Sequence, residues 1–193
     1  MEREPGGTNP ETPPNVSVIM VHRDLRRVPH PPLPDGYRFR PYRDGDVPVW
    51  VRIQQAAETF FVPTAATFAE TLPGDADYLA RRVLFLVAPD GDDIGTITAW
   101  DDDAFEGRRL GHIHWVAIVP DAQGRGLAKP LLGAACRRLR EHGFNEAYLE
   151  TGTGRIAALN LYLRSGFVPH PRDDAERAAW RAVAPRLKAP LTV

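Results

Sequence analysis

VAIVPDAQGRGLAKPLL (Val116–Leu132) contains an apolar run, a short loop with two glycines and the beginning of a second apolar pattern. The run predicts a buried strand that ends at Val119, because Pro120 and Asp121 interrupt it. The second pattern, which begins at Leu127, has the spacing of an amphipathic helix. Glycines allow a tight turn, and the beginning of a helix adds unpaired N–H donors and partial positive charge.

This strand–loop–helix segment predicts a cradle for a pyrophosphate group. The alternative is a plain strand–helix connector that contains two glycines. The loop is not a Walker A loop, since no Gly-Lys-Ser/Thr follows the glycines, and it does not fit the dinucleotide fingerprint GxGxxG. The predicted cradle, with the charges of its Arg and Lys at the rim, consists of Gln123, Gly124, Arg125, Gly126, Leu127, Ala128 and Lys129.

The patterns on either side predict an α/β fold with a mixed sheet (α+β), because strands come first and then alternate with helices. Residues 60–77 are expected to form a loop with a short helix, and residues 101–109 a polar connector. The predicted strands are residues 16–21, 37–41, 83–88, 94–100, 112–119, 147–151 and 167–168. The predicted helices are residues 44 or 46 to 58, 127–142, 156–163 and 174–183.

Composition divides the chain into four segments. Residues 1–15 are rich in Pro, Gly, Glu and Asn and are predicted to be a disordered tail. Residues 16–36 are predicted to be an extended N-terminal segment, in which four prolines stiffen the part after Val28. The compact domain is expected at residues 37–170, followed by a C-terminal helix and tail over residues 171–193.

Charge and composition exclude several classes of protein. The 193 residues carry a formal net charge of −1, which provides no basic field for nucleic acid. No apolar run approaches the roughly 18 residues of a membrane helix, and the N-terminus lacks the apolar core of a secretory signal. Cys136 is the only cysteine, so neither an internal disulfide nor a cysteine-based zinc site is possible. We therefore expect a cytoplasmic protein in which Cys136 is buried on its helix.

The glycine loop also carries a recognisable motif. Gln123-x-x-Gly126-x-Ala128 resembles the Q/R-x-x-G-x-G/A motif of the GCN5-related N-acetyltransferase (GNAT) superfamily. The resemblance implies the GNAT acyl-CoA N-acyltransferase fold, with a loop that binds the pyrophosphate of acetyl-CoA as co-substrate and without a metal. It also implies that the backbone of Val116, Ala117 and Ile118 bonds the pantetheine arm.

A second segment, residues 157–167, resembles the A-x-x-L-Y-x-x-x-G-F segment of the same family. The resemblance implies that Tyr162 lies near the coenzyme sulfur and reprotonates the departing thiolate, for which a phenol is a suitable acid. The alternative is that Tyr162 packs in the core. The family often has Asn where this chain has Arg155, and Asn160 is the remaining candidate for a contact to the coenzyme, although it cannot be assumed to replace that Asn.

A general base is needed to deprotonate the acceptor amine. His112 and His114 alternate on one strand and therefore share a face, and imidazole titrates near neutral pH. Their H-x-H spacing resembles the arylalkylamine N-acetyltransferase branch, which implies a water-filled proton path with His114 nearer the coenzyme-binding segment. Two structural histidines or a weak metal pair are the alternatives, and Glu150 on the following strand is the rival base.

Two further groups of residues have weaker patterns. The acidic residues Asp101–Asp103 and Glu106 either attract a cationic amine or form a solvated hairpin loop. The aromatic residues either line an apolar acceptor pocket or belong to the core, and they are Trp50, Phe60, Phe61 and Trp100.

Together these observations predict direct transfer of an acetyl group from acetyl-CoA to a primary amine. The acceptor is a small-molecule or peptide amine, whose identity the sequence does not give. A non-catalytic acyl-CoA-binding regulatory module is the alternative. We expect no nucleic acid or membrane partner, and the oligomeric state, for which a homodimer is one option, stays open.

Overall fold

The computed structural model describes residues 15–189 and 191. The chain divides into a larger compact unit, Val21–Leu149, and a smaller unit that consists of the residues before and after it. The predicted disordered tail, residues 1–15, lies outside the described residues except for Asn15. The described strands form a seven-stranded mixed sheet in the order β2-β3-β4-β5-β6-β1-β7, which confirms the predicted fold class.

The larger unit contains most of this sheet. Strands β2 (Arg38–Pro41), β3 (Val83–Val87), β4 (Asp93–Phe105) and β5 (Arg108–Ile118) pair antiparallel in that order. Strand β6 (Ala147–Gly152) then pairs parallel with β5, with His112 opposite Tyr148. The unit also contains a 3-10 turn, η1 (Leu25–Arg27). Of strand β1 (Ser17–His22), the last two residues, Val21 and His22, belong to this unit.

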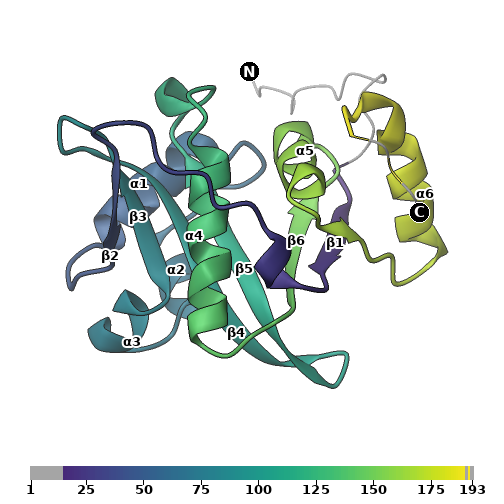
Figure 1. Ribbon diagram of the computed structural model, residues 1–193, viewed down its shortest axis with the longest axis horizontal. Helices are drawn as coiled ribbons and strands as arrows, with labels where there is room; N and C mark the ends of the chain where they lie inside the picture. Colours follow the sequence, from purple (N-terminus) through teal and green to yellow (C-terminus); the bar gives the residue numbers. More distant parts are fainter. Residues whose placement is uncertain (1–14, 190, 192–193) are drawn as a thin grey trace, which may run out of the picture. The chain divides into compact units, whose positions relative to one another are not determined.

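Helices cover both faces of the sheet in this unit (Figure 1). Helix α4 (Ala128–Glu141) lies on one face, where Gly111 has no room for a side chain because its Cβ would lie 2.7 Å from Leu139. Cys136 is buried on this helix, as predicted. Helices α1 (Val47–Ala57), α2 (Ala65–Thr71) and α3 (Ala76–Ala80) lie on the other face. Core side chains of these helices, together with Leu72 directly after α2, pack with Val83 and Phe85 of β3, and they are Trp50, Ile53, Phe68 and Leu79.

An ion triad connects β2 to the beginning of α1 and of β4. The Arg40 guanidinium, only 11% exposed, bonds the carboxylates of Asp46 at 2.6 Å and Asp93 at 2.7 Å. It also lies over the ring of Phe85, 4.2 Å from the ring centre. Asp46 is the residue before α1 but makes no capping bond to the helix, because its carboxylate accepts from Arg40 and from the backbone of Arg43 instead.

The smaller unit contains α5 (Ile156–Arg164), the short strand β7 (Val168–Pro169), α6 (Asp174–Val183) and a 3-10 turn η3 (Ala184–Arg186). Later segments donate backbone hydrogen bonds to β1 and to the residue before it, from His170 to Ile19 and from Thr153 to Val16, each at 2.9 Å. Trp180 of α6 is fully buried, so this predicted helix is packed through at least one large side chain.

Two sequence expectations about loops need correction. Residues 60–77 contain the expected short helix, α2, and also the beginning of a second, α3. The side chains of the preceding residues, Thr64 and Asp75, cap the two helices. Residues 101–109 are almost entirely strand, and only Glu106 and Gly107 form the turn between β4 and β5.

Aspartate disfavours strands when considered alone, which is why the sequence indicated a connector in this region. Tertiary partners outweigh this propensity here. Asp101 bonds Arg82 at 2.8 Å, Asp102 accepts from the Tyr148 hydroxyl at 2.5 Å, and Asp103 bonds Arg109 at 2.9 Å. The expected solvated loop is thus a strand pair whose carboxylates have protein partners, although Asp103 is 78% exposed.

Candidate functional site

A β-bulge interrupts β5 at the segment that the sequence singled out. Thr96 pairs with Ala117 and Thr98 with His114, so Trp115 and Val116 together lie opposite the single residue between these threonines. Trp115 has a φ of 53°, a left-handed conformation that is uncommon for a residue with a large side chain. A bulge bends the strand and leaves the ladder locally unpaired, so backbone groups become available next to Val116.

Two helices hold this bulge in place. Gln54 of α1, which is 4% exposed, donates from its Nε2 to the Trp115 carbonyl oxygen at 3.0 Å. The indole Nε1 of Trp115 donates to the Thr71 hydroxyl of α2 at 2.9 Å. The indole also meets the rings of Trp50 and Phe61 edge-on, with ring centres 4.9 and 6.1 Å away. Sequence reasoning missed Gln54 and Thr71, and no local pattern distinguishes them from other polar helix residues.

The glycine loop follows the bulged strand directly. Gln123 donates from its Nε2 to the Ile118 carbonyl oxygen at 2.8 Å, which fastens the loop to the end of β5. Gly124 and Gly126 have φ values of 74° and 78° with no atom near a hypothetical Cβ, so they are needed for backbone conformation rather than for space. A short 3-10 turn, η2 (Pro120–Ala122), precedes them.

The loop ends at the beginning of α4, where N–H groups point out of the helix. Within the described residues, the N–H groups of residues 124–129 make no hydrogen bond to another backbone group. Leu127 is buried and anchors the turn, whereas the side chains of Arg125 and Lys129 are exposed. Arg125 donates to the Asp121 carbonyl at 2.8 Å and to the Tyr37 hydroxyl at 3.4 Å. The loop and the beginning of α4 thus present free backbone donors beside two cationic side chains, and the predicted binding of a pyrophosphate here stays a prediction.

The two histidines of β5 lie on one face, as predicted, and their rings stack with centres 4.5 Å apart. Burial, together with the neighbouring His112, lowers the pKa of His114 from 6.5 to about 3. In the described part of the chain its Nδ1 is buried and has no hydrogen-bond partner. His114 is therefore neutral at physiological pH.

His112 stacks on Tyr148 of β6, with ring centres 4.3 Å apart and planes only 8° from parallel. The Tyr148 hydroxyl donates to Asp102 at 2.5 Å. Burial acts to raise the Asp102 pKa, but hydrogen bonds from Tyr148 and the Ala104 backbone, with charge on His112, outweigh it and lower the pKa. A carboxylate thus lies at the His112 end of the pair.

Three predicted site residues belong to the smaller unit. Tyr162 on α5 is buried, and burial raises the pKa of its phenol despite the opposing charge of Arg155. The Asn160 side chain donates to the Ile156 carbonyl at 2.9 Å and accepts from the Lys188 backbone at 2.7 Å. Glu150 is exposed and accepts from the Ser17 hydroxyl at 2.7 Å. Their predicted roles stay predictions.

The predicted aromatic residues divide between core and surface. Trp50 is fully buried in the core cluster, and Trp100 packs edge-on against Tyr78. Phe60 and Phe61 are about half exposed, at 48% and 47%, on the loop between α1 and α2. Among the four predicted aromatic residues, Phe61 is the one that is both half exposed and in contact with Trp115 of the bulge.

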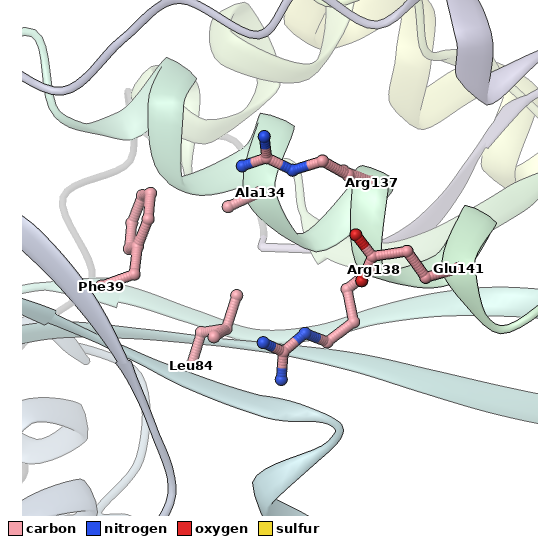
Figure 2. A pocket seen from close by; sticks show the side chains of 6 residues that line it. All are labelled: Phe39, Leu84, Ala134, Arg137, Arg138 and Glu141. Carbon is pink, nitrogen blue, oxygen red and sulfur yellow. The ribbon is translucent and has the colours of Figure 1, made fainter.

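A separate hollow of about 260 Å³ lies on the α4 face of the sheet (Figure 2). Phe39 and Leu84 line it from the strands, whereas Arg137, Arg138 and Glu141 line it from α4. Strand alternation places it on the face opposite to the histidines, so it contains none of the predicted site residues.

Two features are absent from the described residues. No group of three or more His, Cys, Asp or Glu side chains in residues 15–189 is arranged to hold a metal ion. None of the helices in that range combines the length and the apolar character that crossing a bilayer requires.

Known proteins resemble this chain in sequence. The chain matches the Acetyltransferase (GNAT) family over residues 47–167. A mycothiol acetyltransferase from Geodermatophilus obscurus is 29% identical over 181 residues, covering 84% of this chain and 55% of that protein. The mycothiol acetyltransferase of Streptomyces coelicolor is 32% identical over 168 residues, covering 82% and 53%. The chain thus spans about half the length of these relatives.

Solved structures share the fold. A GCN5-related N-acetyltransferase from Sphaerobacter thermophilus superimposes with a TM-score of 0.68 at 22% identity, covering 82% of this chain and 50% of that one. A chain of the NatC complex bound to Gag peptide and CoA has a TM-score of 0.60 at 21% identity, covering 70% and 86%. The bulged strand, glycine loop and helix, together with a family match over more than half its length, show that this chain belongs to the acetyltransferase (GNAT) family.

Proposed function

We propose that this chain is an acetyl-CoA-dependent N-acetyltransferase that acts by direct attack of a primary amine on the thioester. One observation carries the proposal: a strand with a bulge at Trp115 runs straight into a glycine loop whose N–H groups make no backbone bonds in the described chain. Such a segment offers donors for a thioester carbonyl and for a pyrophosphate in one continuous stretch. Family membership and the mycothiol acetyltransferase relatives support it.

In this proposal the coenzyme binds along β5 and the loop. The backbone of Val116, Ala117 and Ile118 bonds the pantetheine arm and polarises the thioester carbonyl. The N–H groups of residues 124–129 hold the pyrophosphate, with Arg125 and Lys129 at the rim. Gln123 contributes by fastening the loop, because its own N–H already donates to the Pro120 carbonyl at 3.0 Å. Asn160 is the weakest member of the set, because both its donor and its acceptor are already engaged within the smaller unit.

The chemical step needs one base and one acid. The amine nitrogen forms a bond to the acetyl carbon, the carbon–sulfur bond breaks, and the thiolate takes a proton from Tyr162. The amine proton passes to the histidine pair, a role that its H-x-H resemblance to arylalkylamine N-acetyltransferases favours. Glu150 is the rival base. Side-by-side positioning of the two substrates supplies most of the acceleration.

The proposed acceptor is a small-molecule or peptide amine with an apolar portion. Phe60, Phe61 and Val62 are 48%, 47% and 72% exposed, which is unusual for large apolar side chains, and Phe61 contacts Trp115 of the bulge. The relatives are named for mycothiol, so amines that also carry a thiol belong among the candidates. The proposed functional unit is residues 37–170 and its proposed location the cytoplasm.

The test is a panel of amines incubated with acetyl-CoA, with the acetylated product detected by mass. Product mass is preferable to thiol release, because an aminothiol acceptor would itself react in a thiol assay. A Gly126→Asp chain, in which the cradle is filled by a carboxylate, is the matched control. The rival proposal, a non-catalytic acyl-CoA-binding module, predicts calorimetric binding of acetyl-CoA with no acetylated product from any amine in the panel.

A further inference from the structure

Five aromatic rings stack in sequence along one face of the sheet in the larger unit. They run from Phe105 at the β4–β5 turn, through Tyr148, His112 and His114, to Trp115 at the bulge. Neighbouring ring centres are 4.1, 4.3, 4.5 and 5.1 Å apart in that order. We call these five rings the ring ladder. It connects the two histidines, which are the predicted base, to the β4–β5 turn, which the sequence analysis expected to be a polar connector.

The groups on the two sides of the histidine pair differ in charge. At the Tyr148 end, the Asp102 carboxylate accepts the tyrosine hydroxyl at 2.5 Å and lies close enough for charge on His112 to lower its pKa. At the other end, the side chain beside His114 is the indole of Trp115, whose N–H is already donated to Thr71. Among these contacts the one carboxylate therefore lies on the His112 side of the pair.

We infer that Asp102 and Tyr148 are positioning residues that make His112, rather than His114, the ring that holds the proton taken from the acceptor amine. This inference rests on the proposed acetyltransferase function and names the base within it. His114 then remains neutral, because two adjacent imidazolium rings would repel each other.

The physical reasons concern both members of the pair. A tyrosine that donates to a carboxylate has a more electron-rich ring, and the face of that ring lies against His112, where it attracts a cation. The carboxylate adds attraction through space. The titratable side chains near His112 in the described larger unit include His114 and Tyr148, which stack on it, and Asp102, which lies behind the Tyr148 hydroxyl. Glu150 follows two residues after Tyr148 on β6.

Asp102→Asn tests the inference, and Asp103→Asn is its matched control. Both remove one negative charge from adjacent residues of β4, but the Asp103 side chain is 78% exposed and bonds Arg109 instead of Tyr148. Tyr148→Phe is a second variant that keeps the stacked ring and removes only the hydroxyl bond. Circular dichroism verifies that each full-length variant is folded.

The first readout is the imidazole titration of His112, followed by NMR on histidine-labelled chain and assigned with His112→Gln. We expect its midpoint to fall by about half a pH unit or more in Asp102→Asn, by less in Tyr148→Phe and not in Asp103→Asn. The second readout is the acidic limb of kcat/KM, which should move to lower pH by the same amounts, with KM for acetyl-CoA unchanged.

Three results would overturn the inference. They are equal titration midpoints in the Asp102 and Asp103 variants, a titrating ring that proves to be His114, and an acidic limb that stays fixed while His112 shifts. If the acidic limb of kcat/KM shifts in Glu150→Gln but in none of the other variants, Glu150 is the base and the inference is also wrong. If no amine is acetylated at all, the proposed function fails, and the NMR midpoints alone then decide whether Asp102 sets the charge of His112.

Discussion

Replacing Gln54 with leucine removes the hydrogen bond that holds the strained bulge. The change leaves side-chain volume nearly constant but takes away the only side-chain donor that the described residues offer to the Trp115 carbonyl oxygen, at 3.0 Å. A buried acceptor without a partner costs about 1–3 kcal/mol. The left-handed backbone conformation of Trp115 itself costs about 1–3 kcal/mol, and the contacts around the bulge must offset this strain.

With a urea dependence of about 2 kcal/mol per molar, we expect Gln54→Leu to lower the unfolding midpoint by roughly 0.5–1.5 M. We also expect acetyl-CoA to bind about fivefold more weakly or worse, because the N–H groups beside Val116 lose their fixed direction. Urea unfolding followed by circular dichroism and calorimetry of acetyl-CoA binding measure the two effects.

Gln55→Leu is the matched control for this prediction. Gln55 is the next residue of α1, and its Nε2 also donates to a backbone carbonyl, that of Pro63 at 2.8 Å, but its side chain is exposed. Water can replace that bond, so its loss should change stability by no more than about 0.5 kcal/mol. Equal urea midpoints and equal acetyl-CoA affinities in the two variants would refute the role of Gln54 as the clamp.

Three further predictions concern the loop, the acid and the buried histidine. Gly126→Asp should weaken acetyl-CoA binding at least tenfold by calorimetry, about 1.4 kcal/mol, whereas Gly107→Asp, at a φ of 74° with the same open space, should not; equal affinities contradict the cradle. Tyr162→Phe should lower kcat by roughly 100- to 10,000-fold with acetyl-CoA affinity little changed, and a kcat within about twofold of the parent would return Tyr162 to core packing. The His114 pKa is lower in the folded chain, about 3 against 6.5, so the unfolded chain binds the extra proton and stability falls as pH drops below 6.5. Between pH 7.5 and 5, His114→Phe should lose about 2 kcal/mol less unfolding free energy in urea than the parent does, and identical pH dependence would show that His114 is not buried and neutral.

The sequence predicted the central segment well because its signals are local. Strand β5, the turn at Pro120 and the helix that buries Cys136 each follow from residues within a few positions of one another. The shared face of His112 and His114 follows from strand alternation alone, and the stacked rings confirm it.

The parts that the sequence did not predict depend on distant partners. Asp102 belongs to a strand because Tyr148, 46 residues later, donates to it, and no local rule anticipates that bond. Gln54 donates to the carbonyl oxygen of a residue 61 positions later. Because every residue has a backbone carbonyl, the sequence does not indicate which one a glutamine side chain will bind. The positive φ of Trp115 could not be inferred either, since glycine or asparagine is the usual residue in that conformation.

The Arg40 triad has a consequence for how the protein responds to heating. Its three charged side chains are 11–17% exposed, so much of their cost lies in lost hydration, and that cost decreases as temperature rises. The attraction between the charges persists, so the triad stabilises the fold relatively more in warm solution than in cold. Because Asp46 directly precedes α1, the helix that carries Gln54 is connected to β2 by an interaction whose desolvation cost falls on warming. The helix that supplies the bulge with its hydrogen-bond donor is thus anchored at its first turn by an attachment that favours the folded state more in warm solution.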